Sequence, residues 1–239
     1  MTIDFDLHKK EIDQKGFTII DAVFTENEVA EINGFIENEN IPQQKKSNDL
    51  FAIRKFLTVL PGIKSKLLNV NIKSIISNIF GSGYFIVKGL YFDKPARSNW
   101  FVAYHQDLSV SVINKTDSLN YKGWTVKDNQ FGVQPPTEIL ENIYTIRIHL
   151  DDCNSENGAL HVIPGSHKKG IYTLSSDDQR RKTEVTCEVP KGGIMLMRPL
   201  LLHASHKSTA TAARRVLHLE CCNKELPESI HWAEKEFIS

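Results

Sequence analysis

The stretch NIYTIRIHLDDCNSENGALHVIPGS (142–166) sets the pattern for the second half of the chain. Its first part, 142–152, and its last part, 158–166, are rich in the β-branched and aromatic residues that favour strands. Between them, Asp151 and Asp152 lead into NSENG, a run of residue types that favour turns. We therefore expect two β-strands joined by a turn.

Short strands of the same kind are predicted on both sides of this stretch. They are YFIVKGLYF (84–92), WFVAYHQDLSVSV (100–112), TEVTCEV (183–189), GGIMLMR (192–198) and RRVLHLECC (214–222). Clusters of Asn, Gly, Pro and Ser separate them, which is typical of a sandwich or a barrel. Segment 114–138 has little apolar periodicity and is too long for a hairpin loop. Inserted loops of that length are often functional lids, and the sequence leaves open whether this one covers a substrate.

The first third of the chain is predicted to be helical. FTENEVAEINGFIENEN (24–40) offers Thr25 as an N-cap, with Glu28 at the spacing of a capping box. LPGIKSKLLNV (60–70) and NIKSIISNIFGSG (71–83) indicate two further helices, the second of which ends in glycines.

These patterns predict an α+β protein with an all-β core. A helical layer over about residues 1–82 would pack on an antiparallel sandwich of about seven or eight strands over about residues 83–223. A length of 239 residues suits one domain, so we expect a single domain over 1–239.

Composition excludes several classes of function. Basic and acidic residues number 29 each, which gives no electrostatic reason to expect nucleic acid or an anionic membrane as a partner. The N-terminus has no apolar region of a secretory signal, and no run approaches 18 apolar residues, so the expected location is the cytoplasm. The four cysteines show no CxxC spacing and are expected to be reduced thiols.

His105 and Asp107, in YHQDLSV (104–110), are the first candidate metal ligands. Residues i and i+2 of an extended strand point to the same face, so the imidazole and the carboxylate can aim at one point. His203, after the apolar strand at 192–198, can complete a two-histidine, one-carboxylate set. Such a set leaves three positions of an octahedral metal open, enough for a chelating 2-oxo acid and O2.

A basic residue that could bind the cosubstrate follows His203 in the sequence. Arg214 and Arg215 are adjacent, and on a strand they point to opposite faces, so only one can bind the distal carboxylate of 2-oxoglutarate. The sequence favours Arg214 without excluding Arg215.

At this point the sequence resembles the phytanoyl-CoA dioxygenase family. The resemblance rests on YHQDLSV (104–110), RIHLDDCNSENGALHVIPGSHKKG (147–170) and KGGIMLMRPLLLHASHKSTATAARRVLHLE (191–220). The second stretch is the most specific, and residues 85–222 match well. The resemblance implies a double-stranded β-helix of the jelly-roll, cupin-like kind.

The same resemblance implies a ligand set and a cosubstrate. His105, Asp107 and His203 match the residues that hold Fe(II), and Arg214 matches the arginine that binds 2-oxoglutarate. Ser205 matches a hydroxyl that helps hold the same carboxylate, and Arg147 falls where a side chain commonly contacts the cosubstrate. Arg54, in a looser alignment, is a further candidate for that work.

The implied activity is that of a 2-oxoglutarate-dependent dioxygenase using Fe(II) and O2. It hydroxylates an unactivated C–H of a small organic molecule and forms succinate and CO2. Related halogenases replace the carboxylate ligand by a small residue, so Asp107 favours hydroxylation. We expect a small-molecule substrate other than phytanoyl-CoA, and the sequence does not reveal the oligomeric state. The alternatives are a non-catalytic jelly-roll ligand-binding protein and a cupin-like metalloenzyme that does not use 2-oxoglutarate.

Overall fold

A computed structural model describes residues 2–39, 51–94, 101–117, 120–127, 130–172, 183–207 and 214–238. The helices are α1 (Phe5–Lys15), α2 (Glu26–Asn38), α3 (Phe56–Val59), α4 (Lys64–Leu67), α5 (Val70–Ile75) and α6 (Thr137–Glu141), with the short turns η1 (Pro61–Ile63), η2 (Ile76–Phe80) and η3 (Ser166–Lys169). The strands are β1 (Phe17–Ile20), β2 (Phe51–Arg54), β3 (Phe85–Lys94), β4 (Val102–His105), β5 (Val110–Val112), β6 (Lys122–Lys127), β7 (Gln130–Gln134), β8 (Ile143–His149), β9 (Leu160–Val162), β10 (Val185–Cys187), β11 (Ile194–Met197), β12 (His203–Ser205), β13 (Arg214–Cys222) and β14 (Glu236–Phe237).

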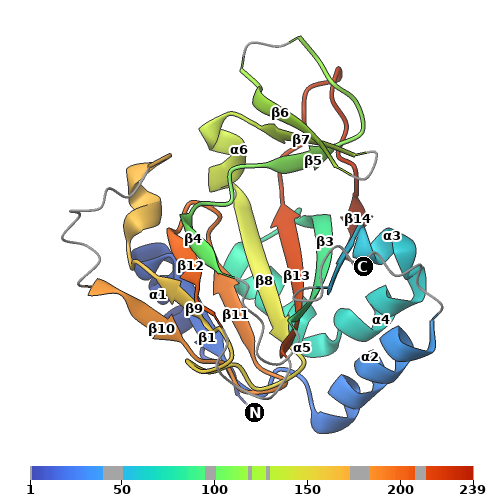
Figure 1. Ribbon diagram of the computed structural model, residues 1–239, viewed down its shortest axis with the longest axis vertical. Coiled ribbons are helices and arrows are strands. Elements are labelled where there is room, and N and C mark those ends of the chain that lie inside the picture. The colour runs from blue at the N-terminus through green and yellow to red at the C-terminus, as the bar shows by residue number, and fades with distance from the viewer. Residues whose placement is uncertain are drawn as a thin grey trace.

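The strands form three antiparallel sheets. The major sheet has the order β1-β11-β8-β13-β3-β14, with β2 also paired to β3. The minor sheet, β10-β9-β12-β4, faces it, and the third sheet, β5-β7-β6, lies across one end (Figure 1). The predicted fold, a jelly-roll core with helices packed against it, is confirmed.

Strand alternation explains why the major sheet is buried on both faces. On β13, Leu217, Leu219 and Cys221 belong to the apolar cluster that also contains the buried residues of the helices. The alternate residues His218 and Glu220 point the other way, into a cavity between the two sheets. The strand thus presents an apolar face to the helices and a polar face to the cavity. All four cysteines are free and buried.

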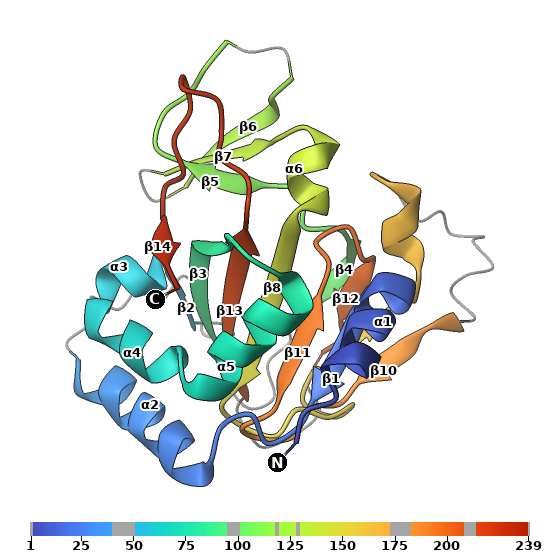
Figure 2. The same cartoon turned by 180° about the vertical axis from the view of Figure 1, so that it is seen from behind.

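Helices α1 to α5 cover the outer face of the major sheet (Figure 2). The predicted capping box of α2 is present: the Glu28 N–H donates to Thr25 Oγ1 at 3.2 Å, and the Thr25 N–H donates to Glu28 Oε2 at 2.7 Å. Segment 60–83 forms two helical stretches, as predicted: η1 runs into α4, and α5 runs into η2. The second stretch begins at Asn69, whose side chain accepts from the Ile72 N–H at 2.9 Å. Among the residues described, no helix has both the length and the apolar character needed to cross a bilayer.

Several strands differ from the prediction. β1 and β2 lie within the first third, which was predicted to be helical, and they pair with β11 and β3. The predicted strand at 100–112 is divided into β4 and β5. Segment 114–138 is not a loop throughout, because it forms β6, β7 and the start of α6; residues 118, 119, 128 and 129 lie outside the described part.

The C-terminal segment ties the third sheet to the major sheet. Trp232 forms a bridge to Val112 of β5, and β14 pairs with β3. Between these contacts lies Glu234, which is 4% exposed and accepts a hydrogen bond from the Gly89 N–H at 2.9 Å. Its second oxygen, Oε1, is buried and has no hydrogen-bond partner. Burial raises the pKa of Glu234 to about 7, against the lowering effect of that N–H and of nearby lysines.

Glu234 should therefore make stability depend on pH. The folded state holds the carboxyl proton more tightly than the unfolded chain does, so the free energy of unfolding should fall as pH rises from the ordinary carboxyl value toward 7. Glu234→Gln should reduce this fall by roughly 1–3 kcal/mol between pH 5 and pH 8. Urea unfolding at pH 5 and pH 8 measures this change in the free energy of unfolding. The exposed Glu228→Gln serves as the control. Parallel pH profiles of wild type and Glu234→Gln would contradict the assignment.

Candidate metal centre

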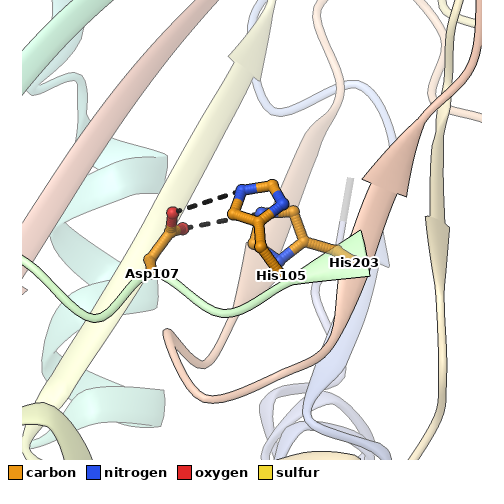
Figure 3. A group of neighbouring side chains, drawn as sticks. All are labelled: His105, Asp107 and His203. Atoms are coloured by element: carbon orange, nitrogen blue, oxygen red, sulfur yellow. Dashed lines mark ion pairs between the residues drawn. The ribbon is translucent and has the colours of Figure 1, made fainter. Parts of the chain in front are cut away.

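The two candidate histidine ligands come from neighbouring strands of the minor sheet. β4 ends at His105 and β12 begins at His203, and the two residues are directly paired in the register. Asp107 lies in the loop after β4, where its N–H donates to the Pro199 carbonyl at 2.8 Å. The predicted trio lies together (Figure 3), although the two-residue strand spacing invoked for it is wrong, because the strand stops at His105.

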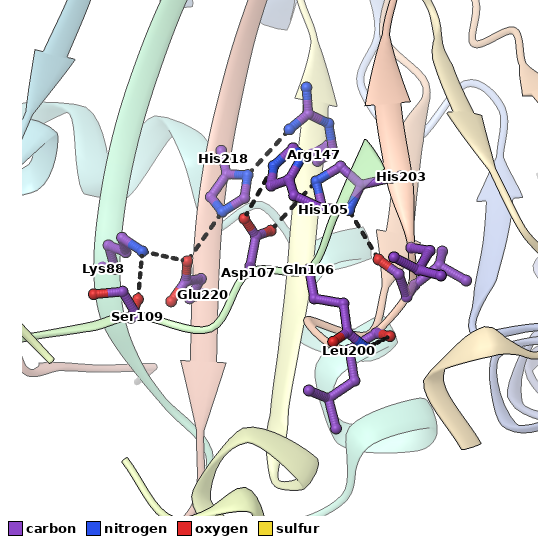
Figure 4. Close-up of polar contacts among 12 residues, drawn as sticks. Lys88, His105, Gln106, Asp107, Ser109, Arg147, Leu200, His203, His218 and Glu220 are labelled. Carbon is purple, nitrogen blue, oxygen red and sulfur yellow. Dashed lines mark hydrogen bonds and ion pairs between the residues drawn. The ribbon is translucent and has the colours of Figure 1, made fainter. Parts of the chain in front are cut away.

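Gln106 fixes the loop that carries Asp107. Its side chain is buried, and Nε2 donates to the carbonyls of Leu200 at 2.6 Å and Gly170 at 2.9 Å. Its Oε1 accepts from the Tyr172 N–H at 2.8 Å. The residue between the two ligands of the His-x-Asp motif thus anchors the loop to the segment that leads into β12 (Figure 4).

Backbone carbonyls orient both imidazoles. His105 Nδ1 is 2.9 Å from the Ala103 oxygen, and His203 Nδ1 is 2.9 Å from the Leu201 oxygen. A carbonyl only accepts, so each Nδ1 carries the proton and each Nε2 keeps a lone pair. The two Nε2 atoms lie 3.9 and 3.7 Å from the carboxylate oxygens of Asp107. Donor atoms that share one ion in adjacent positions lie about 3 Å apart, so small side-chain rotations bring these three into range.

The charges at this point suit a divalent cation. Burial alone would raise the pKa of Asp107, but the nearby His203, His218, Lys88 and His105 lower it to about 2. Burial lowers the pKa of His203 to about 4, more than the neighbouring Asp107 carboxylate restores it. At neutral pH the site therefore offers an anionic carboxylate and a neutral imidazole, the protonation states that metal ligation requires.

The three side chains border a cavity of about 210 Å³ between the major and minor sheets. One end of this cavity is basic. Arg214 and Lys94 lie opposite each other in the register of β13 and β3, and both are buried. The Arg214 guanidinium donates to the Gly158 carbonyl, which also accepts from Ser205 Oγ at 3.1 Å. Three residues far apart in sequence thus meet at one carbonyl oxygen.

Two guanidiniums at the basic end have unused donors. Arg147 and Arg214 are each 7% exposed, and the Nε of each is buried without a hydrogen-bond partner. Among the described residues, no carboxylate pairs with either one. Burial and the nearby Arg214 lower the pKa of Arg147 to about 10. Buried cations of this kind are stabilised by an anion, so this end of the cavity fits a carboxylate group.

Arg215 points away from the cavity, on the other face of β13. Its guanidinium contacts Asp151 at 2.8 and 2.9 Å and Glu37 at 3.1 Å. Of the two adjacent arginines, Arg214 is the one that faces the candidate ligands. Arg54 lies on β2 and lines a neighbouring hollow rather than the metal cavity.

Several residues of the cavity wall were not among the predicted ligands or cosubstrate contacts. His218 accepts from Arg147 at Nδ1, 3.1 Å away, and approaches Glu220 Oε1 through Nε2 at 3.2 Å. Lys88, also in the cavity wall, donates to the same Glu220 oxygen at 2.7 Å. His149, at the end of β8, is 2% exposed. A signal was present for Glu220, because it lies an even number of residues after Arg214 and so shares its face of the strand.

A second group of possible ligands lies nearby. It comprises His161, Glu184 and His206. The rings of His161 and His206 stack at 3.9 Å with an interplanar angle of 23°, so their nitrogen lone pairs do not converge as the metal geometry requires. His161 Nδ1 already contacts Glu184 at 3.0 Å. The first group is the better metal centre, because there the backbone carbonyls leave both Nε2 atoms available.

Comparison with known proteins finds a family match over the region that contains the candidate ligands. The family model for phytanoyl-CoA dioxygenase (PhyH) matches residues 83–216. A phytanoyl-CoA dioxygenase domain-containing protein 1 homolog from Caenorhabditis briggsae is 22% identical, over 96% of this chain and 94% of the relative. The related protein from Danio rerio is 31% identical over 34% of this chain and 33% of its own length.

Solved structures share the fold at low sequence identity. EvdO2 from Micromonospora carbonacea var. aurantiaca, complexed with 2-oxoglutarate, superposes with a TM-score of 0.69 at 19% identity, covering 100% of this chain and 96% of that one. HygX from Streptomyces hygroscopicus, with nickel, 2-oxoglutarate and hygromycin B bound, gives 0.66 at 16% identity, covering 93% and 88%. The family match includes all three candidate ligands and Arg214. The chain therefore belongs to the phytanoyl-CoA dioxygenase (PhyH) family and is an oxygenase of that family.

Proposed function

We propose that the protein is an Fe(II)- and 2-oxoglutarate-dependent dioxygenase that hydroxylates an unactivated C–H of a small organic substrate. The observation that carries this proposal is the joint placement of two features in one cavity. His105, Asp107 and His203 converge with their ligand atoms available, and the Arg214 guanidinium lies in the wall of the same cavity. The 2-oxoglutarate bound to EvdO2 and HygX, which share the fold, supports the same reading.

Each residue has a defined task in this proposal. His105, Asp107 and His203 would hold the metal, and all three side chains line the cavity. Arg214 and Ser205 bind the distal carboxylate of 2-oxoglutarate, and Arg147 contributes a second guanidinium to the same anion. Bound there, the metal and 2-oxoglutarate supply the oxidising chemistry that consumes O2, forms succinate and CO2, and hydroxylates the substrate. The protein excludes water and fixes the orientation of each component.

The metal ligands can be tested without knowing the substrate. Anaerobic addition of Fe(II) and then 2-oxoglutarate to the metal-free protein should produce a weak visible charge-transfer band, and air should then release succinate. His105→Ala should abolish both, because it removes an imidazole whose Nε2 faces the site. His231→Ala, at an exposed position, serves as the control.

The outcome also separates the alternative functions. A jelly-roll binding protein gives neither the band nor succinate, and a metalloenzyme of another kind binds metal without responding to 2-oxoglutarate. Absence of both signals from the wild-type protein would overturn the proposal.

The cosubstrate site has a built-in control, because Arg214 and Arg215 are adjacent but face opposite ways. Arg214→Ala should raise the 2-oxoglutarate concentration needed for half of the band by about 10- to 100-fold, the effect of losing charge-assisted hydrogen bonds. Arg215→Ala should leave it unchanged, because its guanidinium contacts Asp151 outside the cavity. Titration of both variants measures the difference, and equal effects would argue against the assignment.

A further inference from the structure

The cavity has a second polar end, on the far side of the metal ligands from Arg214. Lys88 and Glu220 are opposite each other in the register of β3 and β13. Glu220 follows Arg214 by six residues of extended strand, a separation of about 20 Å. The ligand Asp107 lies beside this end, two residues before Ser109, whose carbonyl accepts a hydrogen bond from Lys88 at 3.1 Å (Figure 4). A molecule bound here is therefore distinct from one held by Arg214.

Lys88 and Glu220 form a buried, electrically neutral pair. Their side chains are 16% and 4% exposed, and Lys88 Nζ lies 2.7 Å from Glu220 Oε1. A net charge on a bound group would meet no opposite charge in this pair, and desolvating it would be costly. The pair therefore favours a neutral polar group over a carboxylate or an ammonium.

The pair also leaves one donor and one acceptor unused. An ammonium has three N–H bonds. Lys88 uses two of them, for Glu220 Oε1 and the Ser109 carbonyl, and the third remains available. Glu220 Oε1 accepts from both Lys88 and His218, whereas Oε2 has no hydrogen bond among the described residues. A hydroxyl group both donates and accepts, so a hydroxyl or a pair of neighbouring hydroxyls complements this arrangement.

The adjoining hollow is lined by polar groups together with the apolar side chains of Leu108 and Phe131. Lys88 also lines a space of about 380 Å³ beneath the third sheet. Its wall includes the hydroxyl residues Ser109, Ser111 and Thr125 and the amide residues Gln130 and Gln134. Arg54, the other charged residue of this wall, has an interaction partner of its own. A long acyl chain would strip water from these groups without replacing the lost hydrogen bonds.

We propose that the substrate is a neutral, polyhydroxylated small molecule of the sugar or polyol class, held through a hydroxyl by Lys88 and Glu220. This inference rests on the proposed function, because the hydroxyl is held beside the candidate metal ligands. Lys88 and Glu220 are then the specificity-determining residues. A site built to bond a hydroxyl discriminates strongly against analogues that lack it, since its own polar groups would remain unpaired.

The test uses the full chain loaded anaerobically with Fe(II) and 2-oxoglutarate. The hydroxylated probes are myo-inositol and methyl α-D-glucopyranoside, and the probes of the competing class are octanoate and octanoyl-CoA. Saturable change in the visible charge-transfer band reports binding, and stimulated succinate release under air is a second readout. We expect the hydroxylated probes to perturb the band and the acyl probes to leave it unchanged.

Variants connect the result to the pair. Lys88→Met should weaken binding of the hydroxylated probe at least tenfold while the band itself still forms. Glu220→Gln is nearly isosteric, so it keeps the fold and should give a similar loss by replacing an acceptor with a donor. Lys66→Met removes a lysine that pairs with Glu31 at the surface and should bind the probe like the wild type.

Three results would overturn the inference. The first is a band perturbed by the acyl probes and by neither hydroxylated one. The second is a hydroxylated probe that binds both Lys88→Met and Glu220→Gln as tightly as the wild type. The third is absence of the band from the wild-type protein, which would overturn the proposed function and this inference with it. The first two leave the band intact, so they are distinguishable from the third.

Discussion

Burial of charged side chains on the inner face of the major sheet is the constraint on which the structure depends. Four basic residues and two carboxylates line one cavity: Lys88, Lys94, Arg147, Arg214, Asp107 and Glu220. The helical layer covers the other face of the same strands with apolar contacts, so no strand can turn its polar residues outward. The register is thereby fixed, and with it the position of every cavity group that the major sheet carries.

The two ends of the cavity balance charge in different ways. At the Arg214 end, buried guanidiniums have unused donors and no carboxylate partner among the described residues, so an anion from outside would stabilise them. At the Lys88 end, the ammonium is neutralised by Glu220 of the neighbouring strand. Electrostatics alone would then favour a dianionic cosubstrate at the Arg214 end and a neutral substrate at the Lys88 end, whatever their shapes.

Alternation and residue chemistry made much of this predictable. The buried strands, the Thr25 capping box and the His-x-Asp pair follow from local patterns, because each is decided within a few residues of the chain. Arg214 was favoured over Arg215 by its match to the arginine of the phytanoyl-CoA dioxygenase family. The short strands β1 and β2 were missed because they depend on pairing with β11 and β3, which local propensity does not reveal. The partnership of Lys88 with Glu220 needed the register between two distant strands. Asp107 lies beside the two histidines, as predicted, but the prediction relied on strand geometry. Hydrogen bonds of Gln106 hold its loop instead.

The C-terminal segment bears on the size of the hollow beneath the third sheet, where we propose that the substrate binds. It bridges to β5 through Trp232 and continues into β14, which pairs with β3. The third sheet, which lines the hollow, and β3, which carries Lys88, are therefore connected by one short length of chain. That length would act as a spacer, because none of its residues is among those that line the hollow. Changes in this segment would alter how bulky a molecule the hollow admits while leaving the candidate metal ligands as they are.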